Sequence, residues 1–270
     1  MATHPNANPL CGSPVPVVFV SHGAPDVLLE AQDTLACWRA IAERIGSPEA
    51  ILVLSAHWQA RVPTASMSIA PQTVHDFAGF APELYRIEYP APGAPALADR
   101  VFSLLSAANI AADLNPDRGF DHGAWVPLSV LYPQAQVPVT QLALSLTGGA
   151  AAHLALGQAL APLREEGVLI LASGGITHNF SWLNWNAAVD TKPFPSARVF
   201  ADWVGERLER RDLASLLDYR QSGNGAAAHP SEEHILPLFV ALGAAQGAAP
   251  HRYQPRFTYG ALAMDAYLWD

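Results

Sequence analysis

Val17-Val18-Phe19-Val20-Ser21-His22 and Ile51-Leu52-Val53-Leu54-Ser55-Ala56-His57 are two apolar runs that each end on a histidine. Runs of this length, rich in β-branched residues and flanked by Pro or Gly, are typical of strands buried on both faces of a parallel sheet. In open α/β sheets, ligands bind outside the carboxyl ends of the strands. Two imidazoles delivered to that edge by separate strands can therefore converge on one metal ion.

A third apolar run repeats this layout. Val168-Leu169-Ile170-Leu171-Ala172 leads into Ser173-Gly174-Gly175 and reaches His178. Between the first two runs, apolar residues at helical spacing predict a helix over residues 32–45, so this part of the chain is expected to form a βαβ unit. Three strand-like runs that end near a histidine favour one shared site.

The rest of the chain continues the alternation of helices and strands. We expect further strands over residues 137–144 and 168–172, and further helices over residues 92–114, 150–164, 197–217 and 232–245. The last helix is expected to carry acids in its first turn, where they favour the helix dipole. Residues 252–269 look extended and are predicted to form a pair of edge strands. No internal repeat or linker is evident.

Composition limits the fold and the partners. The chain has 270 residues, of which 50% are hydrophobic and 14% charged, with a formal net charge of -9. We predict an α/β protein with a central, mostly parallel sheet flanked by helices and a metal site at the carboxyl ends of the strands. Residues 16–270 are expected to form this single catalytic domain, and residues 1–15 a flexible tail. The acidic balance argues against nucleic acid and membrane partners.

The two cysteines and the amino-terminal residues indicate a compartment. Cys11 and Cys37 form no Cys-x-x-Cys pair and no disulfide framework, so reduced thiols in a cytoplasm are expected. The amino-terminal residues lack the charged and apolar regions of a signal peptide, and no apolar run is long enough to span a membrane. The sequence specifies no oligomeric state.

Six of the ten histidines lie in predicted loops or at the ends of predicted elements: His22, His57, His122, His178, His229 and His234. A lone histidine in such a place is most often a hydrogen-bonded loop residue. Two histidines that end separate strands, as His22 and His57 do, favour shared metal coordination instead. His4, His153 and His251 have no such setting and are interpreted as structural.

His122 and His178 are candidates for proton transfer, because an imidazole titrates near neutral pH. His122 lies in Gly119-Phe120-Asp121-His122-Gly123, where small residues leave room around the ring. It could equally be a turn histidine bonded near Asp121. His178 could be a base at the edge of the site or a further metal ligand, and the sequence alone leaves both roles open.

The segment His229-Pro230-Ser231-Glu232-Glu233-His234 offers a third ligand, either His234 or Glu233, although its acids also suit an ordinary helix start. His75-Asp76-Phe77-Ala78-Gly79-Phe80 and residues 85–92 contain aromatic and small residues that could line a flat organic substrate. A Pro-rich loop packed on the core is the commoner meaning of such a stretch. The candidate substrate-contacting residues are His75, Phe77, Tyr89 and His229.

The ordered set of these motifs resembles the class III extradiol ring-cleaving dioxygenases, in their DOPA-dioxygenase-like branch. The motifs are Ser-His-Gly at His22, Ser-Ala-His-Trp at His57, His75-Asp76-Phe77, Tyr89-Pro90-Ala91-Pro92-Gly93, Phe120-Asp121-His122-Gly123, Ser173-Gly174 through His178-Asn179, and Glu233-His234 with Leu236-Pro237-Leu238. The resemblance runs from about His22 to the end of the chain. It implies a single α/β domain with a mononuclear metal, Fe(II) for activity, with Zn(II) possible in the purified protein.

The resemblance also implies roles for the histidines. His22, His57 and His234 would be ligands, and His122 and His178 would be acid/base residues, with His178 a possible fourth ligand. The expected reaction is extradiol opening of a small aromatic diol, a substituted, DOPA-like catechol, with both atoms of O2 incorporated. The broader family closes its site with a carboxylate, whereas this chain has His234 at that place, and three imidazoles suit zinc as readily as iron. A zinc-dependent hydrolase and a non-catalytic, Memo-like binding protein are the alternatives.

Overall fold

A six-stranded sheet forms the centre of the molecule, with the strand order β6-β2-β8-β1-β10-β9. The computed structural model describes residues 14–145, 147–187, 191–222 and 224–270. The sheet strands are β1 (Val17–Ser21), β2 (Ala50–Ser55), β6 (Val139–Gln141), β8 (Val168–Gly174), β9 (His251–Tyr253) and β10 (Ala266–Trp269). Strands β6, β2, β8 and β1 run parallel, whereas β10 is antiparallel to β1 and β9 antiparallel to β10.

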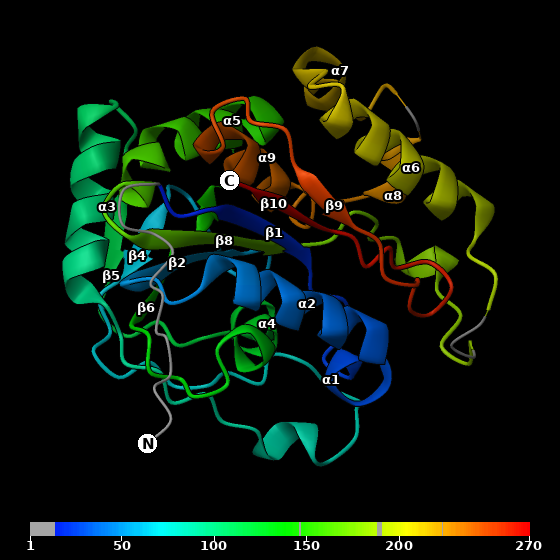
Figure 1. Cartoon of the computed structure of the whole chain (residues 1–270), viewed down its shortest axis with the longest axis horizontal. Coiled ribbons are helices and arrows are strands. Elements are labelled where there is room, and N and C mark those ends of the chain that lie inside the picture. The colour runs from blue at the N-terminus through cyan, green and yellow to red at the C-terminus, as the bar shows by residue number, and fades with distance from the viewer. Residues whose placement is uncertain (1–13, 146, 188–190, 223) are drawn as a thin grey trace, which may run out of the picture.

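Helices cover both faces of this sheet (Figure 1). One face packs against α2 (Gln32–Ile45) and α4 (His122–Leu131), and the other against α3 (Pro95–Ala107), α5 (Gly149–Leu160), α6 (Pro195–Glu209) and α9 (Leu236–Ala244). Alternate strand residues supply the two cores: Val18 and Val20 face α2, whereas Val17 and Phe19 face the larger helical layer. The central strands are therefore apolar on both faces, as the sequence predicted.

The remaining helices and strands are short. The short helices are α1 (Val27–Glu30), α7 (Leu213–Leu217) and α8 (Gly225–Ala228), and 3₁₀ turns cover Leu84–Arg86, Ala161–Arg164 and Phe180–Trp182. Two small parallel pairs lie outside the main sheet: β3 (Gln59–Ala60) with β7 (Leu144–Ser145), and β4 (Thr64–Ser66) with β5 (Asp113–Asn115). They lie in the connections around β2 and α3.

The predicted fold class is confirmed, but several element boundaries were wrong. The helix expected over residues 197–217 is divided between α6 and α7, because Arg211 adopts φ 54° and Asp212 caps α7 by accepting from the Ser215 N–H. The helix expected over residues 92–114 ends at Ala107, and β5 begins at Asp113. The strand expected over residues 137–144 is divided between β6 and β7.

The last predicted helix also starts later than expected. Helix α9 begins at Leu236 rather than Glu232, so the acids Glu232 and Glu233 precede it. Pro237 explains the shift, because proline is tolerated in the first helical turn but clashes with the backbone deeper in a helix. The edge pair predicted over residues 252–269 is present as β9 and β10.

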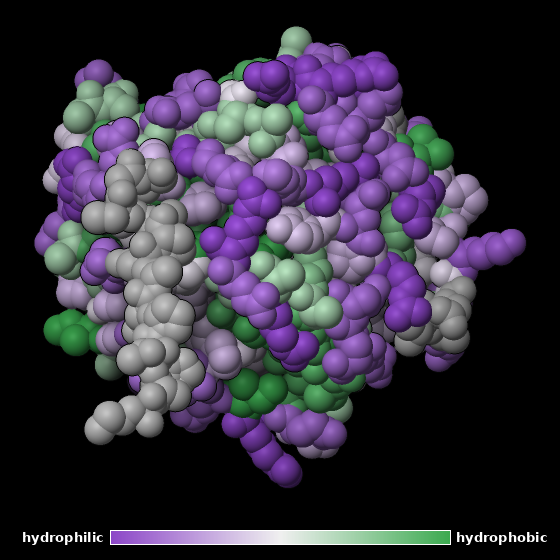
Figure 2. Space-filling model, in the orientation of Figure 1, coloured by the Kyte–Doolittle hydropathy of each residue, from purple (hydrophilic) through white to green (hydrophobic). Residues whose placement is uncertain are grey.

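The face of the molecule shown in Figure 2 is mainly hydrophilic, with smaller hydrophobic patches between. Of the predicted tail, residues 1–13 and with them His4 lie outside the described residues, whereas Val15 is buried and its N–H donates to the Arg164 carbonyl. Within the described part of the chain, no helix has the length and apolar character needed to cross a bilayer.

Candidate metal centre

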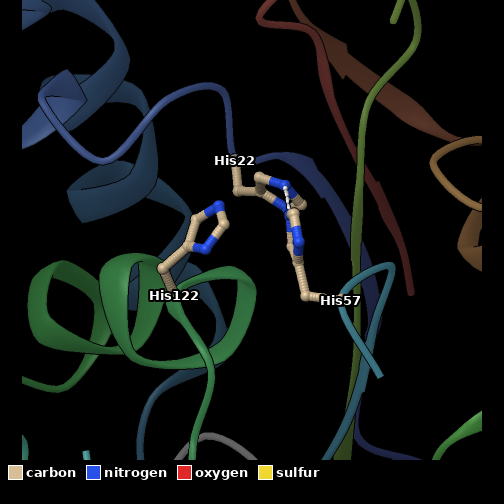
Figure 3. Close-up of side chains that lie close together, drawn as sticks. All are labelled: His22, His57 and His122. Carbon is tan, nitrogen blue, oxygen red and sulfur yellow. Dashed lines mark hydrogen bonds between the residues drawn. The ribbon is translucent and has the colours of Figure 1, made fainter. Parts of the chain in front are cut away.

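Five histidines meet at the carboxyl edge of the parallel strands. His22 directly follows β1, His57 lies two residues after β2, and His178 lies four residues after β8. His122 is the first residue of α4, and His234 lies two residues before α9. Figure 3 shows the rings of His22, His57 and His122 turned toward one another. The convergence predicted from the strand ends is therefore present, joined by two histidines from helix starts.

Among the described residues, two groups have donor atoms within 4.8 Å of one another and could hold a metal ion: His22, His57 and His122, and His178, Glu233 and His234. The ring centroids of His22 and His57 are 5.0 Å apart, those of His22 and His234 5.4 Å, and those of His57 and His234 5.0 Å. Imidazoles that share an ion at a metal–nitrogen distance of about 2.0–2.1 Å place their centroids about 4.5 to 5.2 Å apart. The Nε2 atoms of His22 and His57 are 3.1 Å apart. His22 and His57, and His57 and His234, thus have the spacing of ligands to one metal ion, and His22 and His234 lie only slightly farther apart.

Hydrogen bonds fix which ring nitrogen is free to bind a metal ion. The Ser173 hydroxyl donates to the Gly123 carbonyl, so its oxygen accepts from Nδ1 of His22 at 2.9 Å. The Glu233 carboxylate accepts from Nδ1 of His234 at 3.0 Å. In both rings Nε2 is left with a free lone pair, the form that binds a metal.

Burial keeps the rings neutral. Loss of solvent, followed by the neighbouring histidines, holds the pKa of His22 and that of His234 well below the ordinary histidine value. Burial together with the charge of His122 lowers the pKa of His57 to about 4. Neutral imidazoles are the ligating species, so the site is ready for a cation at neutral pH.

His122 lies beside this trio and is held by a carboxylate. Asp76 Oδ1 accepts hydrogen bonds from the backbone N–H and from Nδ1 of His122, each at 2.9 Å. The other carboxylate oxygen, Asp76 Oδ2, lies 3.7 Å from Nδ1 of His57. Burial opposes ionisation of Asp76, but the bonds to His122 outweigh it and bring the pKa of Asp76 to about 2. The centroids of His57 and His122 are only 3.9 Å apart, closer than the spacing expected of two ligands.

His178 stacks on His234. Their rings are nearly parallel, at 8°, with centroids 3.4 Å apart, and Nδ1 of His178 lies 3.9 Å from the Glu233 carboxylate. Burial lowers the pKa of His178. His178, Glu233 and His234 are close enough together that they could also hold a metal ion.

A cavity of about 390 Å³ opens over the histidines. Its walls are mostly apolar, and Phe77 stands perpendicular to His122 with centroids 5.7 Å apart. The large apolar side chains that line the cavity are Phe77, Phe80, Phe180, Leu183, Trp185, Leu262 and Met264. An apolar pocket with a few convergent polar groups is the common form of a small-molecule site.

The predicted substrate residues differ in placement. Phe77 lines the cavity, but His75, Tyr89 and His229 are not among the described residues that do. His75 Nε2 bonds the Ile87 carbonyl, the Tyr89 hydroxyl donates to the Tyr132 carbonyl, and His229 is fully buried. His229 Nε2 bonds the Ile176 carbonyl. All three residues lie outside the cavity wall, so direct substrate contact is not supported for them. The interpretation of His153 and His251 as structural fits their positions, one buried in α5 and one exposed in β9.

Sequence reasoning missed the anchors of the imidazoles. Asp76 and Ser173 lie in segments whose motifs are visible, but nothing in their spacing shows which histidine each would hold. A second anchor network lies beneath the site, where buried Asp121 accepts from Ser55 at 2.6 Å and from Gln141 and Arg118 at 2.8 Å. It connects the end of β2 with the start of α4.

The sheet edge, the convergent imidazoles and the apolar cavity define an α/β protein that can hold one metal ion beside a small molecule. Residues 11–264 match the family described as the catalytic LigB subunit of aromatic ring-opening dioxygenase, whose members bind a catalytic metal. The chain belongs to this family and is an extradiol dioxygenase.

Named relatives agree. The chain is 38% identical over 242 residues to the 4,5-DOPA dioxygenase extradiol of Escherichia coli (strain K12), covering 87% of each chain. It is 40% identical over 235 residues to the protein of the same name from Beta vulgaris, covering 84% of this chain and 85% of that one. The crystal structure of an uncharacterized protein from Escherichia coli K12 superposes with a TM-score of 0.79 at 33% identity, covering 95% of this chain and 100% of that one.

Acid should destabilise the metal-free protein. An unfolded histidine binds a proton near pH 6.5, whereas burial lowers the pKa of folded His229 to about 3. Stability is therefore fully present above about pH 6.5 and falls as the pH drops toward the folded value, by about 1.4 kcal/mol per pH unit for each such histidine. Urea unfolding over this range measures the slope.

In the His229→Gln variant, the free energy of unfolding should fall less steeply with decreasing pH than in the wild type. The difference in slope should correspond to the uptake of about one proton fewer on unfolding. Val240→Ala, which creates a cavity in the buried face of α9, should lower stability while keeping the wild-type slope. Equal slopes in the wild type and His229→Gln would contradict the prediction.

Proposed function

We propose that this dioxygenase cleaves a substituted, DOPA-like catechol at an Fe(II) ion held by His22, His57 and His234, within a catalytic domain of residues 16–270. The observation that carries the proposal is the near-equal spacing of three imidazoles that line an apolar cavity. The names of the Escherichia coli and Beta vulgaris relatives support the substrate class. A small aromatic diol and O2 are the reactants.

Three neutral imidazoles accept zinc as well as iron, so the ligands alone do not select the ion. When bound, Fe(II) supplies the redox chemistry that O2 requires and that zinc lacks. The protein's own contribution is to keep the imidazoles neutral, oriented and shielded from bulk water. Ser173 and Glu233 serve this purpose through their bonds to Nδ1 of His22 and His234.

His122 and His178 are the proposed proton-transfer residues. Because Asp76 holds Nδ1–H of His122, the free Nε2 can take a phenolic proton from an entering diol. The resulting imidazolium would be stabilised by the same carboxylate. His178 is stacked on His234 with Glu233 nearby, and can hold or return a proton during ring opening.

The cavity walls suit a flat ring. Phe77 stands edge-on to His122, and Met264 and Leu262 line the same cavity. Apolar walls bind the aromatic face and exclude water, while the diol oxygens face the histidines. This division between apolar and polar lining favours a catechol over a peptide or sugar substrate.

Removal of a proposed ligand should abolish metal retention. His57→Ala and His234→Ala should each lose Fe(II) affinity by well over 100-fold, since loss of even an outer-shell partner typically costs about 10- to 100-fold. Metal content after dialysis, measured by mass spectrometry, reports the loss. His122→Ala is the matched control and should retain one equivalent; a full equivalent in His234→Ala together with loss in His122→Ala would reassign the third ligand.

Removal of either proton-transfer residue should leave the metal in place and slow turnover. His122→Ala and His178→Ala should each lower kcat by roughly 10²-fold, the usual effect of losing a positioned acid or base. Stopped-flow absorbance with metal-verified samples measures the rate. Near-normal kcat in His122→Ala would remove that residue from the mechanism, and metal loss in His178→Ala would make it a ligand.

The reaction itself is tested by anaerobic Fe(II) loading followed by a catechol panel. Oxygen uptake and a yellow semialdehyde product should appear together, vanish on chelation and return with Fe(II) but not with Zn(II). If a sample with verified Fe(II) content consumes no oxygen with any of the catechols, the proposal is wrong. Ester or amide hydrolysis by that sample would instead favour a zinc hydrolase, and metal-dependent protein binding without catalysis a Memo-like role.

A further inference from the structure

A second cavity adjoins the first one at its mouth. It has a volume of about 500 Å³ and shares Ala78, Phe80 and Trp185 with the cavity over the histidines. The shared residues make the two cavities neighbouring compartments, which we call the inner and outer cavities. The outer cavity is lined by Asp26, Leu29, Glu30, Ala78, Gly79, Phe80, Ala81, Trp185 and Tyr259. Because the two cavities share wall residues, a substituent on a ring in the inner cavity can extend into the outer one.

Aromatic side chains form much of the outer wall. Trp185 is 53% exposed although it is a large apolar residue, and its ring lies 4.8 Å from that of Tyr259. Tyr259 is fixed in turn, because its hydroxyl donates to the Asp26 carboxylate and its backbone has φ 51°. Aromatic rings in a cavity wall can contact a cation through their negative faces.

The charge in both compartments has one sign. Asp26 and Glu30 line the outer cavity and Asp76 lines the inner one, and no Lys or Arg is among the described residues that line either. Arg256 lines a neighbouring depression with Asp26 and Glu30, and its backbone N–H and Nε both donate to Asp33. A carboxylate on the substrate would thus meet acidic groups, whereas a cation would meet acids and aromatic faces.

We propose that the outer cavity is a subsite for the ammonium group of an aminoalkyl substituent on the aromatic ring. The proposal rests on the proposed function, since it takes the ring to lie in the inner cavity, and it narrows the substrate to catechols that carry a protonated amine. Trp185 and Tyr259 supply cation–π contacts, and Asp26 and Glu30 supply the counter-charge. In a zwitterionic side chain, the ammonium and not the carboxylate is the recognised group.

Three catechols of similar size test the charge preference. Dopamine carries an ammonium, hydroxytyrosol a neutral hydroxyl and dihydrocaffeate a carboxylate. With the Fe(II) enzyme, kcat/KM should be about tenfold higher for dopamine than for hydroxytyrosol, the combined effect expected of a cation–π contact and an exposed ion pair. It should be lowest for dihydrocaffeate, and high salt should reduce the differences.

Substitutions in the outer cavity test which residues cause the preference for the ammonium group. In Asp26→Asn/Glu30→Gln, which removes both charges with little change in shape, the dopamine-to-hydroxytyrosol ratio should fall to about one. Trp185→Leu should lower the ratio partially, because it removes the ring face and keeps the charges. Glu43→Gln, an exposed acid on α2 that lines neither cavity, is the matched control and should keep the wild-type ratio.

A binding measurement that involves no reaction tests the subsite independently of the proposed function. Calorimetry of the metal-free protein with phenethylamine and phenethyl alcohol needs neither diol, metal nor oxygen. Tighter binding of phenethylamine in the wild type, lost in Asp26→Asn/Glu30→Gln, would support the subsite even if no catechol were cleaved. Equal binding of the two probes, or a catechol preference unaffected by the double variant, would overturn it.

Discussion

Desolvation of neighbouring imidazoles is the interaction on which the site depends. His22, His57 and His234 lie close enough that protonating any two would place like charges a few ångströms apart with little water between them. Burial and mutual repulsion therefore both favour the neutral rings, and the pKa of His22 and that of His234 are held low for this reason. Such a cluster keeps several nitrogen lone pairs unprotonated and close together, and one metal ion can bind them at once.

The hydrogen-bond partners of the histidine rings differ in charge. Ser173 is a neutral acceptor for His22, so it orients the ring without adding charge, whereas Asp76 and Glu233 place a carboxylate behind His122 and His234. A carboxylate behind an imidazole stabilises its protonated form and raises its basicity as a ligand. In the proposed mechanism, the same arrangement would therefore help proton transfer at His122 and metal binding at His234.

The sequence predicted best what depends on local pattern. The start of strand β2 was predicted within one residue because an uninterrupted apolar run is typical of a strand buried on both faces, and that placed His57 just beyond the sheet edge. Tyr89 shows the limit: its aromatic loop suggested a substrate wall, yet its hydroxyl is bonded to Tyr132 forty-three residues away in the chain. Which side of a loop faces a cavity is decided by such long-range partners, and spacing carries no trace of them.

Close backbone approach explains how loops from separate elements reach one point. A methyl group at Gly174 would lie 2.1 Å from the His234 carbonyl, and one at Gly123 would lie 2.3 Å from the Ser55 hydroxyl. Without side chains there, the end of β8 can accept the segment before α9, where the Gly175 N–H donates to the His234 carbonyl at 2.8 Å. Gly174, which precedes His178, thus contacts the segment that carries His234, and Gly123, which follows His122, contacts the segment that leads to His57. His234, which no strand delivers, reaches the metal centre because Gly174 leaves room for its backbone.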